Sequence, residues 1–200
     1  MRAAWVVPAL GLLVAACYSG PSGPVVHRTA VDEEIDLSGR WNDVDSRAVS
    51  VEMVQDLLSR PWLDEWAEAG GKKPRVVVGR VANKSHEHIP TDTFVKDLER
   101  ELVNSGEVSF LASFGQRDQL KAEKLYQAEA ASLETQKAMG RELGADFLLL
   151  GQINSIVDRA GGVTLLYYQV ELELINVETG VKEWIGQKKI KKVVERGEWD

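Results

Sequence analysis

The sequence predicts a single α/β domain in which helices pack against a mixed β-sheet. Between residue 37 and about residue 145, stretches with helical periodicity alternate with short β-branched runs. The remaining residues have the pattern of strands separated by two glycine-containing turns. Helix–strand alternation is typical of α/β sheets, and two successive hairpins form an antiparallel meander. We therefore expect two or three layers, with the meander formed by the C-terminal strands.

The first predicted helix follows Asp43, which is expected to cap it, and continues to about Ser59. Pro61 stops this helix, and a further short helix is expected at 62–69, before the glycines at 70–71. The apolar stripe of the first helix repeats at helical spacing through Val44, Ala48, Val51, Val54 or Gln55, and Leu58.

A buried strand and a second amphipathic helix come next. The β-branched run at 74–81 predicts a strand buried on both faces, and a polar loop follows at 83–90. Thr91 is expected to cap a helix that ends at 104–106, before a short strand at 108–112. The apolar face of this helix comprises Phe94, Val95, Leu98 and Leu102.

The segment at 117–130 is charged and weakly amphipathic, which predicts an exposed helix. Another helix is expected from Ser132 to Leu143, with Gly144 as its stop. The apolar run that follows predicts a buried strand at 145–157.

Two turns and two strands complete the predicted meander. The first turn is expected at 158–162, before a strand at 168–174 whose alternating pattern indicates one solvated face. A second turn is expected at 176–180, and the last strand at 181–194.

The N-terminus has the pattern of a lipoprotein leader. Arg2 precedes an apolar stretch at 3–16, which is well short of the ~20 residues that a membrane-spanning helix needs. Small residues then lead to Cys17, the single cysteine of the chain, in a pattern that resembles a bacterial lipobox. We predict that 1–16 is a signal peptide and that Cys17 becomes an N-terminal residue acylated with chains such as palmitate.

Residues 17–36 are expected to form the lipidated terminus and a flexible tether to a globular domain at 37–200. Glycine and proline at 20–24 disfavour regular structure, and about 19 flexible residues span only ~25 Å on average. Tyr18 stands where an aspartate commonly signals retention in the inner membrane, so we expect an outer-membrane anchor with the domain facing the periplasm. The formal net charge of −7 does not favour nucleic acid as a partner.

Three stretches together resemble the LpoB family, at 37–46, 78–91 and 144–153, with further matching residues at 167–170 and 184–186. The resemblance implies a fold similar to the N-terminal domain of TolB, with no catalysis and no cofactor. It also implies a monomeric outer-membrane lipoprotein in cell wall biogenesis, which binds the regulatory domain of a class A, bifunctional penicillin-binding protein and activates peptidoglycan synthesis. The best-known members carry a longer tether, so the partner here would have to extend towards the domain.

A second hypothesis is a structural outer-membrane lipoprotein that acts as an assembly module in an envelope or export complex. It predicts a ring or another stable oligomer, whereas the activator hypothesis predicts a monomer. An enzyme is not expected, because the sequence has no phosphate-binding glycine loop, no nucleophile elbow and no thiol besides Cys17.

Candidate binding residues cluster in the predicted loop and in the connection at 113–121. His86 and His88 alternate, but His27 is the only other histidine, and zinc usually requires three or four ligands, so we expect no metal site. The alternative is a structural loop or a partner contact. The expected partner-binding residues are Asn83, His86, Glu87, His88, Thr91 and Arg117.

Two further residue groups have both a structural and a binding interpretation. The four lysines at 188–192 are expected to protect an edge strand from aggregation, and the alternative is docking to an acidic partner or to anionic wall polymers. Trp62 and Trp66 share a helix face near Trp41, which favours internal packing over a binding hot spot.

Overall fold

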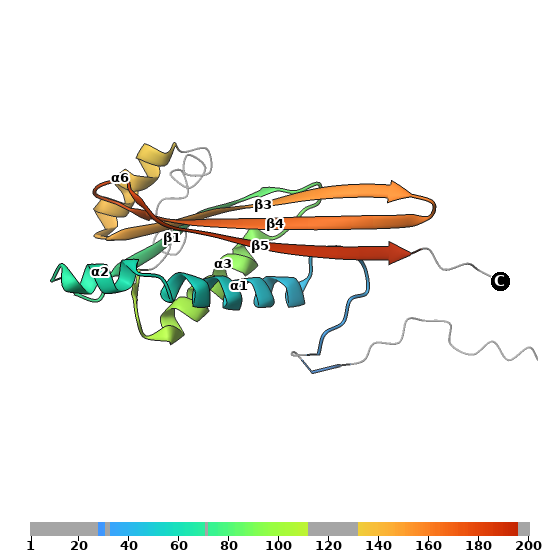
Figure 1. Ribbon diagram of the computed structural model, residues 1–200, viewed down its shortest axis with the longest axis horizontal. Helices are drawn as coiled ribbons and strands as arrows, with labels where there is room; N and C mark the ends of the chain where they lie inside the picture. Colours follow the sequence, from blue (N-terminus) through green and yellow to red (C-terminus); the bar gives the residue numbers. More distant parts are fainter. Residues whose placement is uncertain (1–27, 31–32, 71, 112–131, 196–200) are drawn as a thin grey trace, which may run out of the picture. The chain divides into compact units, whose positions relative to one another are not determined.

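The computed structural model describes residues 28–30, 33–70, 72–111 and 132–195 (Figure 1). The chain divides into two units, 1–33 and 34–200, and all the elements below belong to the second. Its helices are α1 (Asp43–Leu58), α2 (Trp62–Glu68), α3 (Thr91–Ser105) and α6 (Leu133–Leu143). Its strands are β1 (Arg75–Lys84), β2 (Ser109–Phe110), β3 (Phe147–Ala160), β4 (Val163–Asn176) and β5 (Lys182–Glu195).

Several predictions concern residues outside these ranges. They are the signal peptide at 1–16, the acylation of Cys17, most of the tether, the exposed helix at 117–130 and the contact residue Arg117.

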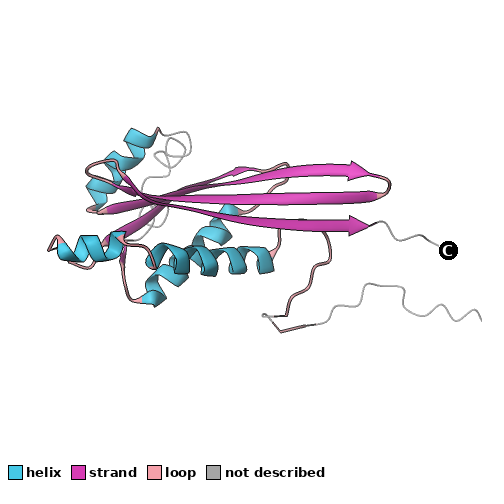
Figure 2. Ribbon diagram, in the orientation of Figure 1, coloured by secondary structure: helices cyan, strands magenta, loops and turns pink. Residues whose placement is uncertain are grey.

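The described strands form one mixed sheet in the order β2-β1-β3-β4-β5 (Figure 2). β1 runs parallel to β2 and β3, whereas β3, β4 and β5 are successive antiparallel neighbours. The predicted α/β class, with a mixed sheet and a C-terminal antiparallel meander, is therefore confirmed.

The helices cover the two faces of the sheet unequally. α1 and α3 pack on each other and on one face, which we call the helix face, whereas α6 packs against β3 on the opposite, outer face. The large core lies on the helix face, around residues such as Phe94, Leu149 and Tyr168. A smaller cluster on the outer face includes Val77, Leu148 and Val177. Because side chains alternate between faces along a strand, β3 residues with even numbers after Leu148 lie on the outer face, and those with odd numbers lie on the helix face.

The first helix has the predicted span but a different cap and a different buried face. Asn42, rather than Asp43, is the N-cap, and it forms a capping box with Asp45. Ala48, expected in the apolar stripe, is exposed. The buried residues are Asp45, Ser46, Val49, Ser50, Met53, Val54 and Leu57. The predicted stripe is right for Val54 and for the partly buried Leu58 but wrong for Ala48. The buried face also includes small polar side chains, and the Ser46 Oγ hydrogen bond of 2.7 Å to Asp97 joins α1 to α3.

Other predicted boundaries are confirmed or shifted for local reasons. α3 buries Phe94, Leu98 and Leu102 as expected, but Thr91 is its first residue and makes no capping hydrogen bond. α6 starts after Ser132 and ends at Leu143, followed by the C-cap Gly144, whose φ of +75° suits glycine. β3 and β4 pair without a break from Phe147↔Asn176 to Ala160↔Val163, which reduces the predicted turn at 158–162 to two glycines. No described helix has the length and apolar character required to cross a membrane.

A lysine from the last strand joins the beginning of the domain to β5. The Lys192 Nζ donates to Asp36 Oδ1 at 2.8 Å and to Asp45 Oδ2 at 2.7 Å, and Asp45 is buried. Burial alone would lower the pKa of Lys192, but the hydrogen bonds to the two carboxylates outweigh it and the pKa is raised. This contact, which we call the Lys192 clasp, holds the residues before α1 against the edge strand.

Replacing Lys192 with Gln is expected to lower the free energy of unfolding by about 2 kcal/mol, because Asp45 loses a charge-assisted hydrogen bond in a buried position. Lys191→Gln is the matched control, since Lys191 lies one residue earlier on the opposite face, and its effect should stay within about 0.5 kcal/mol. Urea unfolding measures both variants, and equal losses would contradict the role of the clasp.

The clasp also predicts a pH dependence. Because the pKa of Lys192 is raised above its usual 10.5 in the folded chain, its contribution to stability is complete below pH 10.5 and is lost as the pH rises through the folded value. The wild-type chain should therefore lose stability more steeply above pH 10.5 than Lys192→Gln does. Parallel profiles in urea titrations between pH 9 and pH 12 would count against this account.

Candidate functional site

The predicted contact loop joins β1 to α3, and hydrogen bonds within the loop and to β3 hold its first part. The Asn83 Oδ1 accepts hydrogen bonds from the backbone N–H and the Oγ of Ser85 at 2.9 and 2.7 Å, and the Asn83 Nδ2 donates to the Glu87 carbonyl at 2.8 Å. The backbone N–H of His86 donates to Ser155 Oγ at 2.9 Å, which fixes the loop to β3. The loop at 85–90 is therefore ordered by its own side chains and by the sheet.

Glu87 points inward and connects the loop to the residues before α1. Its Oε1 accepts a hydrogen bond from the backbone N–H of Trp41 at 3.0 Å and another from the buried Tyr168 hydroxyl. This hydroxyl also lies 3.1 Å from the Gly39 carbonyl oxygen. Burial and the neighbouring Glu87 carboxylate raise the pKa of Tyr168. Because Tyr168 stays protonated, its single hydroxyl hydrogen lies between two acceptors, the Glu87 carboxylate and the Gly39 carbonyl oxygen.

The loop thus presents only some of the expected contact residues to solvent. His86 and His88 are exposed, and the His86 ring stacks on Tyr168 with a centroid distance of 6.4 Å. Asn83 is exposed as well, but its side chain is hydrogen-bonded within the loop. Glu87 is half-buried and hydrogen-bonded to the Trp41 backbone, and Thr91 is half-buried at the start of α3. Among the described residues, no group of three or more His, Cys, Asp or Glu side chains is arranged to hold a metal ion.

The tryptophans pack inside the domain. Trp62 and Trp66 both meet the Phe147 ring edge-on, at centroid distances of 5.0 Å, and each indole N–H donates to a backbone carbonyl. Trp41 contacts Phe94 and Tyr168 in the same edge-on way. The interpretation as internal packing is therefore confirmed.

The lysines at 188–192 lie on β5, at an edge of the described sheet, as the edge-protection interpretation requires. Alternation divides them between the faces. On the helix face, Lys188 pairs with Glu52 and Lys192 forms the clasp. On the outer face, Lys189 and Lys191 are exposed and form no salt bridge with a described residue.

A second polar network, which the sequence did not predict, lies on the outer face around Glu171. The Gln152 Nε2 donates to Glu171 Oε2 at 2.6 Å, and the Nε2 atoms of Gln169 and Gln187 both donate to Glu171 Oε1. These three amides lower the pKa of Glu171, with Gln152 contributing most. We call this set the amide network.

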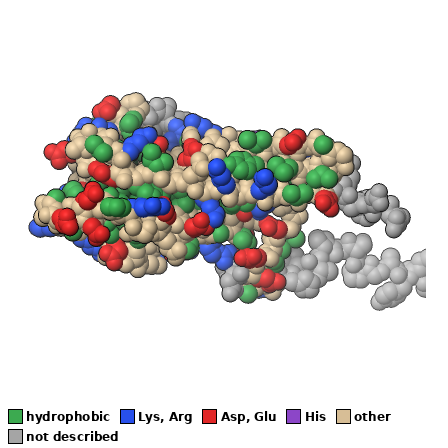
Figure 3. Space-filling view, viewed as in Figure 1, with side chains coloured by type: hydrophobic (Ala, Val, Ile, Leu, Met, Phe, Trp, Pro, Cys, Tyr) green, Lys and Arg blue, Asp and Glu red, His purple; other side chains and the backbone are tan. Residues whose placement is uncertain are grey.

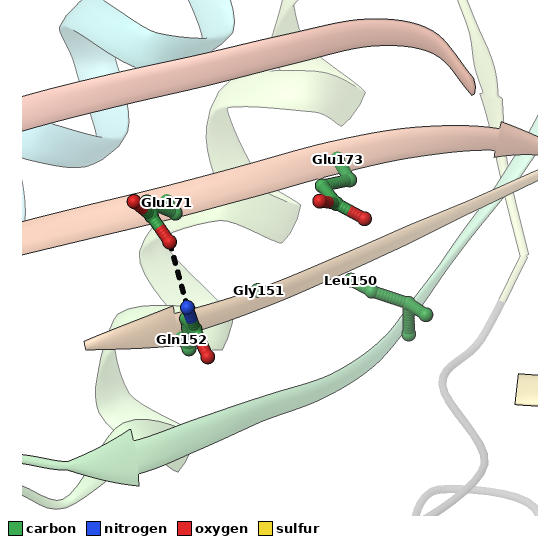
Figure 4. A pocket seen from close by; sticks show the side chains of 5 residues that line it. All are labelled: Leu150, Gly151, Gln152, Glu171 and Glu173. Atoms are coloured by element: carbon green, nitrogen blue, oxygen red, sulfur yellow. Dashed lines mark hydrogen bonds between the residues drawn. The ribbon is translucent and has the colours of Figure 1, made fainter. Parts of the chain in front are cut away.

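A shallow pocket of about 170 Å³ adjoins the amide network (Figure 4). The Glu171 and Glu173 side chains from β4 lie beside Leu150 and Gln152 from β3, with the Gln152–Glu171 hydrogen bond across the two strands. The sequence showed only that Glu171 and Glu173 alternate with apolar residues. The network itself depends on strand register, which brings three strands together.

Comparisons with known proteins give one family and several structures. A family model described as "Peptidoglycan-synthase activator LpoB" matches residues 45–190. A search of curated proteins found no match. The LpoB C-terminal domain from Salmonella enterica is 18% identical over 68% of this chain and 94% of that chain, with a TM-score of 0.43. The LpoB C-terminal domain from Escherichia coli is 17% identical over 66% and 94%, with a TM-score of 0.46. The NMR structure of E. coli LpoB is 16% identical over 96% and 94%, also with a TM-score of 0.46.

Tyr168→Phe is expected to lower the free energy of unfolding by about 1–2 kcal/mol, because Glu87 and Gly39 lose a buried donor. Tyr167→Phe is the matched control: its hydroxyl donates to Gln169 Oε1 on the outer face, and its loss should cost less than about 0.5 kcal/mol. Urea unfolding and amide hydrogen exchange in the loop at 85–90 test the difference. Unchanged protection of the loop in Tyr168→Phe would overturn the proposed connection.

Proposed function

The chain belongs to the LpoB family of peptidoglycan-synthase activators, and on that premise we propose that it is a lipid-anchored periplasmic regulator of a class A, bifunctional penicillin-binding protein. The members of this family are activators and not enzymes, so the chain acts by binding. The family match carries the proposal, because it extends from the first turn of α1 into β5 and therefore includes β1 to β4 and most of β5.

Activation by a binding protein requires a difference in affinity. A regulator shifts the synthase towards its active conformation only to the extent that it binds that conformation more tightly. A surface that is already ordered before binding loses little conformational entropy when the complex forms. The loop at 85–90 has this property, because Asn83, Ser155 and Tyr168 hold it in place.

We propose this loop as the contact for the regulatory domain of the synthase, with the exposed His86 and His88 as contact side chains. Asn83, Glu87 and Thr91 contribute by fixing the conformation of the loop and the start of α3. Arg117 remains a proposed contact in the connection before α6.

The anchor supplies location and effective concentration. We propose a signal peptide at 1–16, a lipidated terminus and tether at 17–36, and a domain at 37–200. The lipobox pattern at Cys17 and the residue after it support an outer-membrane anchor facing the periplasm. With a tether averaging ~25 Å, the partner must extend from its own membrane towards the domain.

The proposal is tested with the full-length protein and a purified class A synthase, by measuring glycan polymerisation and peptide crosslinking. Wild-type protein should stimulate the synthase, and His86→Ala/His88→Ala should raise the concentration for half-maximal stimulation at least tenfold, because the two proposed contact side chains are truncated. Lys72→Ala/Lys73→Ala, an exposed pair before β1, should leave that concentration within twofold of wild type.

No stimulation by the wild-type protein would defeat the activator proposal. A stable oligomer in light scattering, together with no stimulation, would instead favour an assembly module. Stimulation that is insensitive to the histidine substitutions would remove the loop as the contact while leaving the activator role intact.

A further inference from the structure

The outer face of β3, β4 and β5 carries a polar surface. Among the described helices, only α6 packs on this face, against β3. Strand register arranges its side chains in rows across the three strands. The rows are Gln152, Glu171 and Gln187; then Asn154, Gln169 and Lys189; then Ile156, Tyr167 and Lys191; and then Asp158, Leu165 and Val193. The amide groups therefore lie side by side, next to an aromatic ring and two cations.

The amide network fixes the orientation of its groups before any ligand arrives. Each glutamine of the network gives one amide hydrogen to Glu171 and keeps a second one. The carbonyl oxygens of Gln152 and Gln187 accept no hydrogen bond from any residue that the structure describes, and neither amide atom of Asn154 has a partner there. The face thus offers donors and acceptors at fixed positions.

Apolar side chains lie directly beside these polar groups. Ile156 is 63% exposed and Val193 is 55% exposed, and the Tyr167 ring lies between their strands. Figure 3 shows hydrophobic side chains together with Lys or Arg side chains on the surface over the ends of β3–β5 that lie away from α6. Amphipathic ligands with apolar ring faces suit a surface of this composition.

We propose that this outer face binds a glycan strand that bears N-acetyl groups and carboxylates. Sugar hydroxyls and acetamido groups are both donors and acceptors, as the amides of the face are. The acetyl methyl groups and the ring faces have an apolar surface to contact in Tyr167 and Ile156. The carboxylates meet Lys189 and Lys191, the two lysines of β5 that pair with no described residue.

A folded protein partner fits this face less well. The centre of a protein interface is usually apolar and depleted of charge, with aromatic anchors that fill pockets. Here the centre holds a carboxylate and three glutamines, and the adjoining pocket of about 170 Å³ is lined by two carboxylates, one amide, a leucine and a glycine.

The position of the face allows it to act together with the proposed contact loop. His86 is fixed to Ser155 on the helix face, whereas the amide network is on the outer face, so one sheet separates the two surfaces. A synthase at the loop and a glycan at the outer face do not compete for the same side chains. Only the identity of the glycan, as product of the synthase, rests on the proposed function.

The test is cosedimentation of the full-length chain, in detergent, with purified peptidoglycan sacculi, followed by calorimetric titration with soluble muropeptides. Two double variants address the face: Lys189→Gln/Lys191→Gln removes the charges, and Gln152→Ala/Gln187→Ala removes two amides. Lys72→Gln/Lys73→Gln and Gln55→Ala, which are exposed elsewhere, are the matched controls. Thermal unfolding checks that each variant is folded. If the amide double variant does not fold, the variant of the two exposed lysines still tests the proposal.

We expect wild-type binding and a loss of at least tenfold in affinity for each face variant, with the controls within twofold. In a further arm, neutral chitin oligosaccharides should retain sensitivity to the amide substitutions but not to the lysine substitutions, because they lack carboxylates.

No binding of wild-type protein to sacculi, or binding unaffected by both face variants, would overturn the proposal. Synthase stimulation measured on the same samples separates the two ideas. Loss of stimulation in the face variants with unchanged sacculus binding would identify a protein contact and reject the glycan site. Glycan binding without stimulation would reject only the activator role.

Discussion

The buried hydroxyl of Tyr168 is the interaction on which the arrangement of the helix face depends. A tyrosine hydroxyl without a partner in a core is costly, so the two segments that supply acceptors are held where the hydroxyl points. Those segments are far apart in sequence: Gly39 precedes α1, and Glu87 follows β1. Through Glu87 the same contact reaches the Trp41 N–H, and Trp41 in turn packs on Phe94 of α3. One donor on β4 thereby sets the course of the chain into α1 and the conformation of the loop before α3.

The alternation of side chains along β4 and β5 gives the two faces different chemistry. On the helix face the polar side chains of these strands form hydrogen bonds and salt bridges with the chain that covers them, as in the Lys192 clasp, and they lie beside an apolar core. On the outer face the polar groups bond mainly to one another, around Glu171, and remain open to solvent. A lysine cluster that is uniform in the sequence is therefore two different features in the fold. Lys188 and Lys192 are structural, whereas Lys189 and Lys191 are available to a ligand.

Local signals in the sequence were sufficient for the elements, but the contacts between elements required register. Proline and glycine positions predicted where α1, α3 and α6 end, and β-branched runs predicted the strands. The buried face of α1 was misassigned, because apolar residues occur around much of this helix and small serines set its approach to α3. Glu87 was expected among the contact residues, although it points inward, since a loop sequence does not show which side chain meets a buried tyrosine. The amide network was missed because its glutamines come from three strands.

An activator with no catalytic group has to work through surfaces whose shape is fixed before its partner arrives. The loop at 85–90 meets this condition through hydrogen bonds to its own Asn83 and to the sheet, and the outer face meets it through Glu171. The loop is tied to β3 and β4 through Ser155 and Tyr168, and the outer face is formed by β3, β4 and β5, so both surfaces rest on the same pairing of β3 with β4. A rigid domain with two such surfaces would bring the two proposed ligands together by geometry and effective concentration. The physical demand on this chain is therefore rigidity, and the long uninterrupted pairing of β3 with β4 supplies it.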